Sequence, residues 1–292
     1  MTVKSSLRYI PDVDEFLKKA LEEDIGQGDL TTDTFIPKDC MIEGEWFAKE
    51  PCCIAGLDVV RRLFGILDPA IKVFWNVEDG DQLDRGPFGI IKGTARSILK
   101  GERTALNLMQ RLSGIATLTS LFVKKARPYG VQILDTRKTT PLLRVLEKYA
   151  VRMGGGVNHR MGLGEMVLLK DNHRFIIDEL KIADLRKTIQ SLREQKPAVK
   201  IGIEVTKEAE IQDALKSGAD FILLDNMVPE EVCQIVGRWK GKVLLEVSGG
   251  INLENVESYA KTGVDRISIG ALTHSARSVD ISLEVLSVNQ LI

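Results

Sequence analysis

The feature of this sequence that most constrains its fold is a series of short apolar runs, each followed at once by a polar or charged residue. Each run has the length and composition of a buried parallel strand. Three of them end at or beside Glu204, Asp225 and Glu246, which are 21 residues apart each time. That interval fits one strand, one helix and two short loops, so the repeated unit is β/α. The runs are VQILDTRK, MVLLKDN, VKIGIEV, DFILLDN, KVLLEVSGG and DRISIG.

Repetition of a β/α unit favours a barrel, and a doubly wound sheet is the alternative. Because six strands rather than eight can be identified, we expect the barrel to be incomplete. Short strand-like runs alternate with turn-rich segments over residues 41–97, which is typical of a small α+β domain. We therefore predict an α/β protein, with an incomplete (β/α) barrel over 113–275 and a smaller N-terminal α+β sandwich domain over 1–112. A C-terminal helix over 276–292 is expected to join the smaller domain.

The composition limits the classes of function. Forty Lys and Arg residues nearly balance 41 Asp and Glu residues, so the chain lacks the positive field of a protein that binds nucleic-acid phosphates. No segment approaches the roughly 20 apolar residues needed to span a bilayer, and the first residues show no apolar core of signal-peptide length. We expect a cytoplasmic protein that binds neither nucleic acid nor membranes.

Cationic side chains are concentrated around the ends of the first two barrel strands. Such density indicates an anionic ligand. Guanidinium groups bind carboxylates or phosphates through paired hydrogen bonds, whereas lysine contributes a mobile point charge, so a mixed set suits a substrate with several negative groups. The candidates are Arg137, Lys138, His159, Arg160 and Lys170.

Two carboxylates, Glu204 and Asp225, follow different strands but belong to the same barrel face. They could hold a hydrated magnesium ion, ribose hydroxyls, or both. The alternative is that they form ion pairs with lysines such as Lys138 and Lys170, which is compatible with a catalytic role.

Glycine-containing loops follow the last two predicted strands, at Ser248-Gly249-Gly250 and at Gly270. Backbone amides of these loops could converge on a phosphate, as barrel enzymes often arrange. The alternative is a pair of ordinary turns. The residues by themselves indicate a barrel enzyme whose substrates are a phosphorylated metabolite and a second anion.

Long ordered motifs resemble those of the quinolinate phosphoribosyltransferase family. The central block is LDTRKTTPLLRVLEKYAVRMGGGVNHRMGLGEMVLLKDNH, and further blocks are EEDIGQGDLTTD, KGERTALNLMQRLSGIAT, IEVTKEAEIQDALKSGADFILLDNM and LLEVSGGI. The resemblance runs from about residue 22 to the end of the chain. Leu142 and Leu143 differ from relatives that have glycine after TRKTTP, which affects the local shape of the loop.

The resemblance implies a site for the two carboxylates of quinolinate. Arg103, in the GERTALN motif, would reach that site from a neighbouring subunit, so a homodimer is expected, and a hexamer is a further form in the family. The other residues implied for quinolinate are Arg137, His159, Arg160 and Lys170.

The resemblance also implies a site for phosphoribosyl pyrophosphate. Glu204 and Asp225 would lie at the ribose hydroxyls and Mg²⁺, acting with Lys138 near the pyrophosphate as the catalytic set. The 5′-phosphate would bind Ser248, Gly249 and Gly270.

The implied activity is that of a decarboxylating pentosyltransferase, which forms nicotinate mononucleotide, pyrophosphate and CO₂ for NAD synthesis. Two alternatives belong to other classes. One is the related pyrophosphorylase-like protein associated with molybdate transport. The other is a non-catalytic phosphate-binding protein with the same fold, because a fold does not establish a function.

Overall fold

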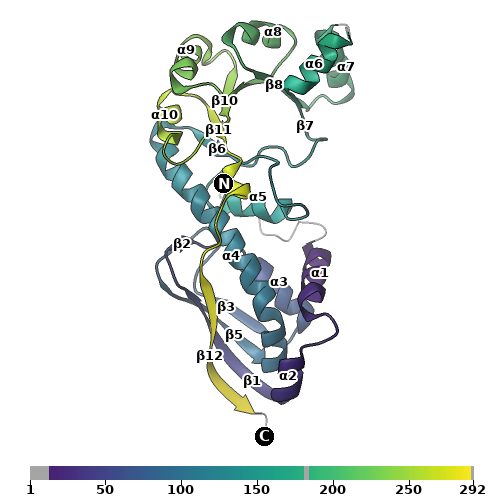
Figure 1. Ribbon diagram of the computed structural model, residues 1–292, viewed down its shortest axis with the longest axis vertical. Helices are drawn as coiled ribbons and strands as arrows, with labels where there is room; N and C mark the ends of the chain where they lie inside the picture. Colours follow the sequence, from purple (N-terminus) through teal and green to yellow (C-terminus); the bar gives the residue numbers. More distant parts are fainter. Residues whose placement is uncertain (1–12, 181–183, 291–292) are drawn as a thin grey trace. The chain divides into compact units, whose positions relative to one another are not determined.

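The computed structural model describes residues 13–180 and 184–290, and its chain forms two compact units (Figure 1). Of the described residues, the first unit contains 13–118, 145–155 and 276–290, and the second contains 119–144, 156–180 and 184–275. The first unit is therefore assembled from three separate stretches of sequence. No helix in the described ranges is both long and apolar enough to cross a bilayer.

The first unit is built on an antiparallel sheet with the strand order β12-β1-β5-β3. Buried and half-buried residues alternate along β1, as expected of a strand with one face against a core. Trp46 of β1 is fully buried, and its ring centroid is 6.3 Å from that of Phe64 and 5.6 Å from that of Trp75. The strands of this unit are β1 (Cys40–Ala48), β2 (Cys52–Cys53), β3 (Lys72–Trp75), β4 (Gln82–Leu83), β5 (Gly86–Thr94) and β12 (Ile281–Gln290).

Helices accompany this sheet, and the longest of them, α4, continues into the second unit. The buried residues Val60, Leu63 and Phe64 of α3 are adjacent or three to four positions apart, so they lie on the same face of the helix. This apolar face packs inward. The GERTALN motif lies in α4, which begins six residues before it. The helices are α1 (Val13–Ile25), α2 (Leu30–Phe35), α3 (Leu57–Leu67), α4 (Ala95–Ala126) and α5 (Arg144–Met153).

The predicted C-terminal helix over 276–292 is wrong, because Ile281–Gln290 forms the strand β12. This segment pairs antiparallel with β1, from Ile281 opposite Ala48 to Gln290 opposite Cys40. Its first half alternates apolar and polar residues, and it contains β-branched valines, both of which favour a strand over a helix. Residues 291–292 of the predicted helix lie outside the described residues.

The second unit contains all six predicted strands, paired in parallel in the order β6-β11-β10-β9-β8-β7. The first of these strands in the sequence pairs with the last, which is the arrangement of a barrel and not of a doubly wound sheet. In the described part of the chain, β6 and β7 share no ladder, so the barrel is incomplete, as predicted. The strands are β6 (Gln132–Leu134), β7 (Met166–Leu169), β8 (Lys200–Val205), β9 (Phe221–Asp225), β10 (Leu244–Ser248) and β11 (Arg266–Ser268).

Helices follow these strands and cover the sheet, so the central strands are buried on both faces (Figure 1). The helix after β9 begins with a proline, which suits the first turn because its missing N–H would have no helical partner. The helices of this unit are α6 (Asp171–Glu179), α7 (Leu185–Gln195), α8 (Ile211–Lys216), α9 (Pro229–Trp239), α10 (Val256–Lys261) and α11 (Ala271–His274).

Candidate active site

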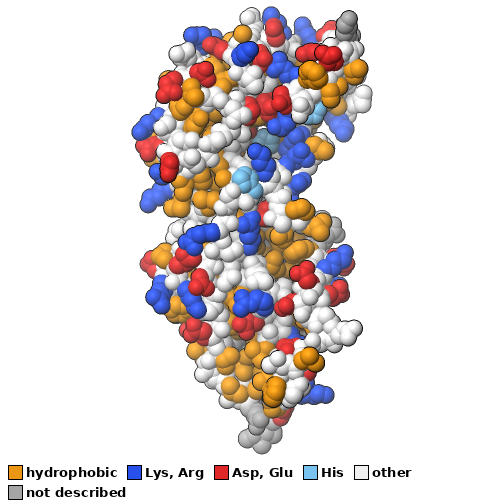
Figure 2. All heavy atoms as spheres, in the orientation of Figure 1, with side chains coloured by type: hydrophobic (Ala, Val, Ile, Leu, Met, Phe, Trp, Pro, Cys, Tyr) orange, Lys and Arg blue, Asp and Glu red, His pale blue; other side chains and the backbone are white. Residues whose placement is uncertain are grey.

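A cavity of about 520 Å³ lies at the carboxyl ends of the barrel strands. Every residue that lines it belongs to the second unit. Figure 2 shows Lys, Arg and His side chains gathered with Asp and Glu side chains on the face in view. The predicted site residues that line the cavity are Arg137, Lys138, His159, Arg160, Lys170, Glu204, Asp225, Ser248 and Gly249.

Two predicted residues are placed outside that lining set. Gly270 follows β11, and a Cβ atom there would be 2.9 Å from Cδ of Lys138 and 3.1 Å from Nε2 of His274. Glycine at this position therefore leaves room for the Lys138 side chain to pass. Arg103 belongs to the first unit, where its side chain is exposed on α4.

Arg137 and Arg160 form a strongly cationic part of the cavity. Arg160 is 8% exposed, and its Nη1 donates a hydrogen bond to the carbonyl of Met166 at 2.8 Å. Burial lowers the pKa of the Arg160 guanidinium, and the positive charge of Arg137 lowers it further. A bound carboxylate or phosphate would relieve this repulsion and accept paired hydrogen bonds.

Asp135, directly after β6, fixes the loop in which His159 lies. It is fully buried, and its Oδ1 accepts a hydrogen bond from the backbone N–H of His159 at 2.9 Å. Its Oδ2 accepts one from Nδ2 of Asn158 at 2.5 Å. Asp135 was not among the site residues predicted from the sequence, although a carboxylate directly after a strand is a signal that could have identified it.

The acidic part of the cavity comes from β8 and β9. Glu204 is 5% exposed, and its Oε2 accepts a hydrogen bond from Nζ of Lys170 at 2.9 Å. Burial raises the pKa of Asp225, and the negative charge of Glu204 raises it further, whereas Lys170 lowers it. The predicted ion pair with Lys170 thus exists for Glu204, and a second cation near Asp225 would stabilise both carboxylates.

Replacing Glu204 by glutamine is expected to lower the pKa of Asp225. The reason is that the variant lacks the nearby negative charge that raises this pKa in the native protein. Asp225 of the native protein should therefore take up its proton at a higher pH than Asp225 of Glu204→Gln. Carboxyl-detected NMR titration would measure both midpoints, with Glu230→Gln, an exposed glutamate of α9, as the control. Equal midpoints in the native protein and Glu204→Gln would contradict the expectation.

His159 contacts the third cavity carboxylate, Glu246 of β10. Nδ1 of His159 accepts a hydrogen bond from the backbone N–H of Arg160 at 2.8 Å. Nε2 of His159 lies 3.3 Å from Oε1 of Glu246. The same Oε1 accepts a hydrogen bond from Oγ of Ser268 at 2.5 Å. The His159 ring is therefore held on both sides, by the backbone of Arg160 and by Glu246.

Gly249 allows the loops after β9 and β10 to approach closely. It has φ of +102°, and a Cβ atom there would be 2.1 Å from Oδ1 of Asn226. The backbone N–H of Asn226 donates to the carbonyl of Ser248 at 2.9 Å, and its Nδ2 donates to Oδ2 of Asp225 at 2.7 Å. The bare α-carbon of Gly249 thus permits the contact that orients Asp225.

Gly249→Ala is expected to destabilise the protein by about 3 kcal/mol, because it combines backbone strain with a steric clash. Gly250 provides a matched control, since it has φ of +62° but no atom within 4 Å of a built Cβ. Gly250→Ala should therefore destabilise by only about 1 kcal/mol. Denaturant unfolding of both variants would measure the difference, and equal losses would show that the clash with Asn226 is unimportant.

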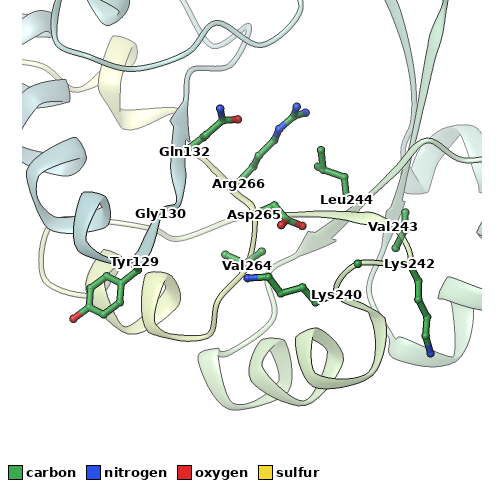
Figure 3. Close-up of a pocket in the computed structure, with 11 residues that line it drawn as sticks. Tyr129, Gly130, Gln132, Lys240, Lys242, Val243, Leu244, Val264, Asp265 and Arg266 are labelled. Atoms are coloured by element: carbon green, nitrogen blue, oxygen red, sulfur yellow. The ribbon is translucent and has the colours of Figure 1, made fainter.

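A second cavity of about 520 Å³ lies at the opposite ends of three strands, β6, β10 and β11 (Figure 3). Nζ of Lys240 donates to the carbonyl of Gly263 at 2.6 Å, and Oδ2 of Asp265 accepts from the backbone N–H of Leu245 at 2.8 Å. Both charged groups thus hold the ends of the barrel together. Since barrel enzymes bind substrates at the carboxyl ends of strands, the first cavity is the candidate active site.

The fold and the first cavity define a β/α-barrel protein with a buried site in which cationic and acidic side chains face one space. The family model described as "Quinolinate phosphoribosyl transferase, N-terminal domain" matches residues 29–113, and that described as the "C-terminal domain" matches residues 115–284. The chain belongs to the quinolinate phosphoribosyl transferase family.

Relatives support the same family over nearly the full length. The chain is 43% identical to a probable nicotinate-nucleotide pyrophosphorylase [carboxylating] of Methanocaldococcus jannaschii, over 93% of this chain and 96% of the relative. It is 40% identical to the quinolinate phosphoribosyltransferase [decarboxylating] 2b, mitochondrial, of Nicotiana tabacum, over 98% of this chain and 85% of the relative. The crystal structure of NadC from Streptococcus pyogenes has a TM-score of 0.88 at 37% identity, covering 98% of this chain and 100% of that one.

Proposed function

We propose that this protein transfers the phosphoribosyl group of phosphoribosyl pyrophosphate to quinolinate and releases CO₂, forming nicotinate mononucleotide for NAD synthesis. The observation that supports this most directly is the division of one cavity into a cationic part, with Arg137 and Arg160, and an acidic part, with Glu204 and Asp225. Quinolinate has two carboxylates, and the donor has ribose hydroxyls and phosphates, so the two parts suit the two substrates.

The cations would hold the acceptor. Arg160 is buried and fixed by Met166, so its remaining guanidinium donors can bind a carboxylate with little loss of side-chain entropy. Lys170 lies between the two parts, because its Nζ already contacts Glu204. We propose that Arg137, Arg160 and Lys170 bind the quinolinate carboxylates, and that His159, which lines the same cavity, contributes through its contact with Glu246.

The acids and the glycine loops would hold the donor. Glu204 and Asp225 face the ribose hydroxyls, Lys138 faces the pyrophosphate, and Ser248, Gly249 and Gly270 surround the 5′-phosphate. In the reaction, the bond from ribose C1 to the pyrophosphate oxygen breaks and the quinolinate ring nitrogen bonds to C1. The pyridinium ring then accepts the electron pair released when the adjacent carboxylate leaves as CO₂, and a proton takes its place on that carbon. Fixed charges would dominate the rate enhancement.

Magnesium fits this site as a hydrated ion and not as an ion enclosed by protein. In the described residues no group of three or more His, Cys, Asp and Glu side chains could hold a metal. Burial raises the pKa of Asp225, and the negative charge of the nearby Glu204 raises it further. Mg²⁺ commonly binds through one or two carboxylates together with substrate phosphates. It would neutralise the departing pyrophosphate.

We also propose a homodimer in which Arg103 completes the partner's acceptor site. Arg103 is exposed on α4 and has space to meet another chain. A hexamer built from such dimers is compatible with this proposal. The cytoplasmic location stays a prediction.

The test of the proposed function is an assay of purified protein with Mg²⁺, phosphoribosyl pyrophosphate and either quinolinate or nicotinate. Nicotinate mononucleotide and CO₂ should form with quinolinate alone, and chelation of Mg²⁺ with EDTA should stop the reaction until Mg²⁺ is restored. A folded protein that forms no product with quinolinate would contradict the proposal and favour the molybdate-associated relative or a non-catalytic role.

A further inference from the structure

Glu246 is a cavity residue to which the family resemblance gave no role. Its side chain is 1% exposed, less than that of Glu204, yet it lines the active-site cavity. In the parallel ladders, Glu204 of β8 and Glu246 of β10 are both opposite Leu223 of β9. The three side chains therefore form one row across the sheet, and all three line the cavity. Glu246 thus extends the acidic part of the site by one strand.

One oxygen of the Glu246 carboxylate is held by two neighbours. Oε1 accepts the hydrogen bond from Ser268 and lies 3.3 Å from Nε2 of His159. Ser268 is 4% exposed, and the His159 backbone is fixed by Asp135, so both neighbours are themselves held in place. The orientation of the carboxylate is set before any substrate binds.

The other oxygen, Oε2, is buried and has no hydrogen-bond partner among the described residues. Burial of a carboxylate oxygen without a donor is unfavourable, and buried polar groups in native proteins are nearly always satisfied. Ser268 and His159 contact Oε1, and Glu246 lines the cavity, so a group bound in the cavity can supply the partner for Oε2. A small hydrogen-bond donor supplied by a bound substrate meets this requirement.

The chemistry of the two substrates decides which one supplies that donor. Near neutral pH quinolinate has only acceptors, namely two carboxylates and a ring nitrogen, and Glu246 would repel it. The phosphoribosyl donor has ribose hydroxyls, which can donate to a carboxylate. Glu246 therefore suits the donor and helps to exclude a quinolinate bound in the wrong half of the cavity.

We propose that Oε2 of Glu246 accepts a hydrogen bond from a ribose hydroxyl of phosphoribosyl pyrophosphate, while Ser268 and His159 hold the other oxygen of the carboxylate. This inference rests on the proposed function, because it requires that substrate pair. Glu246 is then a donor-binding residue, and Ser268 and His159 are positioning residues.

The first test is calorimetric binding of phosphoribosyl pyrophosphate with Mg²⁺ in the presence of phthalate, which has both carboxylates but no ring nitrogen to react. Glu246→Gln should bind the donor about 10- to 100-fold more weakly, as expected for loss of a hydrogen bond to a charged group. Its affinity for quinolinate alone should be unchanged or higher. Glu230→Gln is the control, because Glu230 is exposed on α9 and should leave both affinities unchanged.

The second test uses donor analogues that lack the 2-hydroxyl or the 3-hydroxyl of the ribose. The analogue without the hydroxyl bound by Glu246 should bind the native protein more weakly, but should bind Glu246→Gln no more weakly than the full donor does. Equal penalties in the two proteins for both analogues, or native donor affinity in Glu246→Gln, would overturn the inference.

Two further measurements separate the possible failures. If the native protein neither binds the donor nor forms product, the proposed function fails; if it forms product and Glu246→Gln binds the donor normally, only the role of Glu246 fails.

If thermal melting shows that Glu246→Gln does not fold, Ser268→Ala replaces it, because this variant removes the hydrogen bond to Oε1 and leaves the carboxylate present. Ser268→Ala should bind the donor several-fold more weakly, and this loss should disappear with the same analogue. A loss that persists with both analogues would contradict the inference.

Discussion

Lys170→Met is expected to reduce kcat/KM for quinolinate by on the order of 100-fold or more, as estimated from the loss of charge-assisted hydrogen bonds to a carboxylate. The substitution keeps an unbranched side chain that is one atom shorter, and it removes the charge. It also leaves Glu204, which is 5% exposed, without the ammonium group that lies 2.9 Å from its Oε2. An unpaired buried carboxylate would then repel the quinolinate carboxylates as well. Steady-state rates at varied quinolinate concentration measure the effect.

Lys242→Met is the matched control for that variant. Lys242 is exposed beside the second cavity, where its Nζ lies 5.5 Å from the ring centroid of Trp239. Lys242→Met should retain the native kcat/KM. This result would show that removing a lysine outside the active-site cavity does not reduce turnover. Near-native turnover in Lys170→Met would remove the proposed acceptor site, whereas a large fall in melting temperature would show that Lys170 acts chiefly on stability.

Arg103→Ala is also expected to abolish quinolinate turnover, and a heterodimer of Arg103→Ala with Lys170→Met should recover activity. In a symmetric dimer with shared sites, one of the two sites of this heterodimer has both defects and the other has neither. Co-expression with two different affinity tags allows the heterodimer to be purified, and its activity should be about half of the native value. The separate variants supply the inactive baselines.

Arg85→Ala is the control for the arginine substitution. Arg85 is an exposed arginine of the same unit, and its replacement should leave quinolinate turnover unchanged. A purified heterodimer that stays inactive would contradict the shared site. Active Arg103→Ala homodimers would instead show that Arg103 has no part in binding quinolinate.

The barrel was predictable because its signals are local. Each central strand is a short, mostly apolar run with a charged residue at or near its carboxyl end, as in Phe221–Asp225, where four buried residues precede a half-buried carboxylate. The strand β12 was not predictable in the same way, because the partner that makes Ile281–Gln290 a strand is β1, far away in the sequence. Its short alternating pattern was the available local signal.

The sequence predicted those residues of the site that lie at the ends of strands. A barrel brings these ends together, so Lys170, Glu204 and Asp225 were expected to meet, and they do. Glu246 appeared in the 21-residue spacing but was not selected as a site residue. Its importance depends on the hydrogen bond from Ser268, and hydrogen bonds between strands are not visible in a sequence.

The pairing of β12 with β1 affects how the chain folds during synthesis. β1 is translated before the other strands in the described residues, whereas its neighbour β12 is translated after all of them. Until then one edge of β1 has unpaired backbone groups, which is a risk for aggregation. The barrel strands are all translated before β12. The barrel can therefore fold while the sheet of the first unit still lacks β12. The sheet that contains β1 is thus completed only after every barrel strand has been translated.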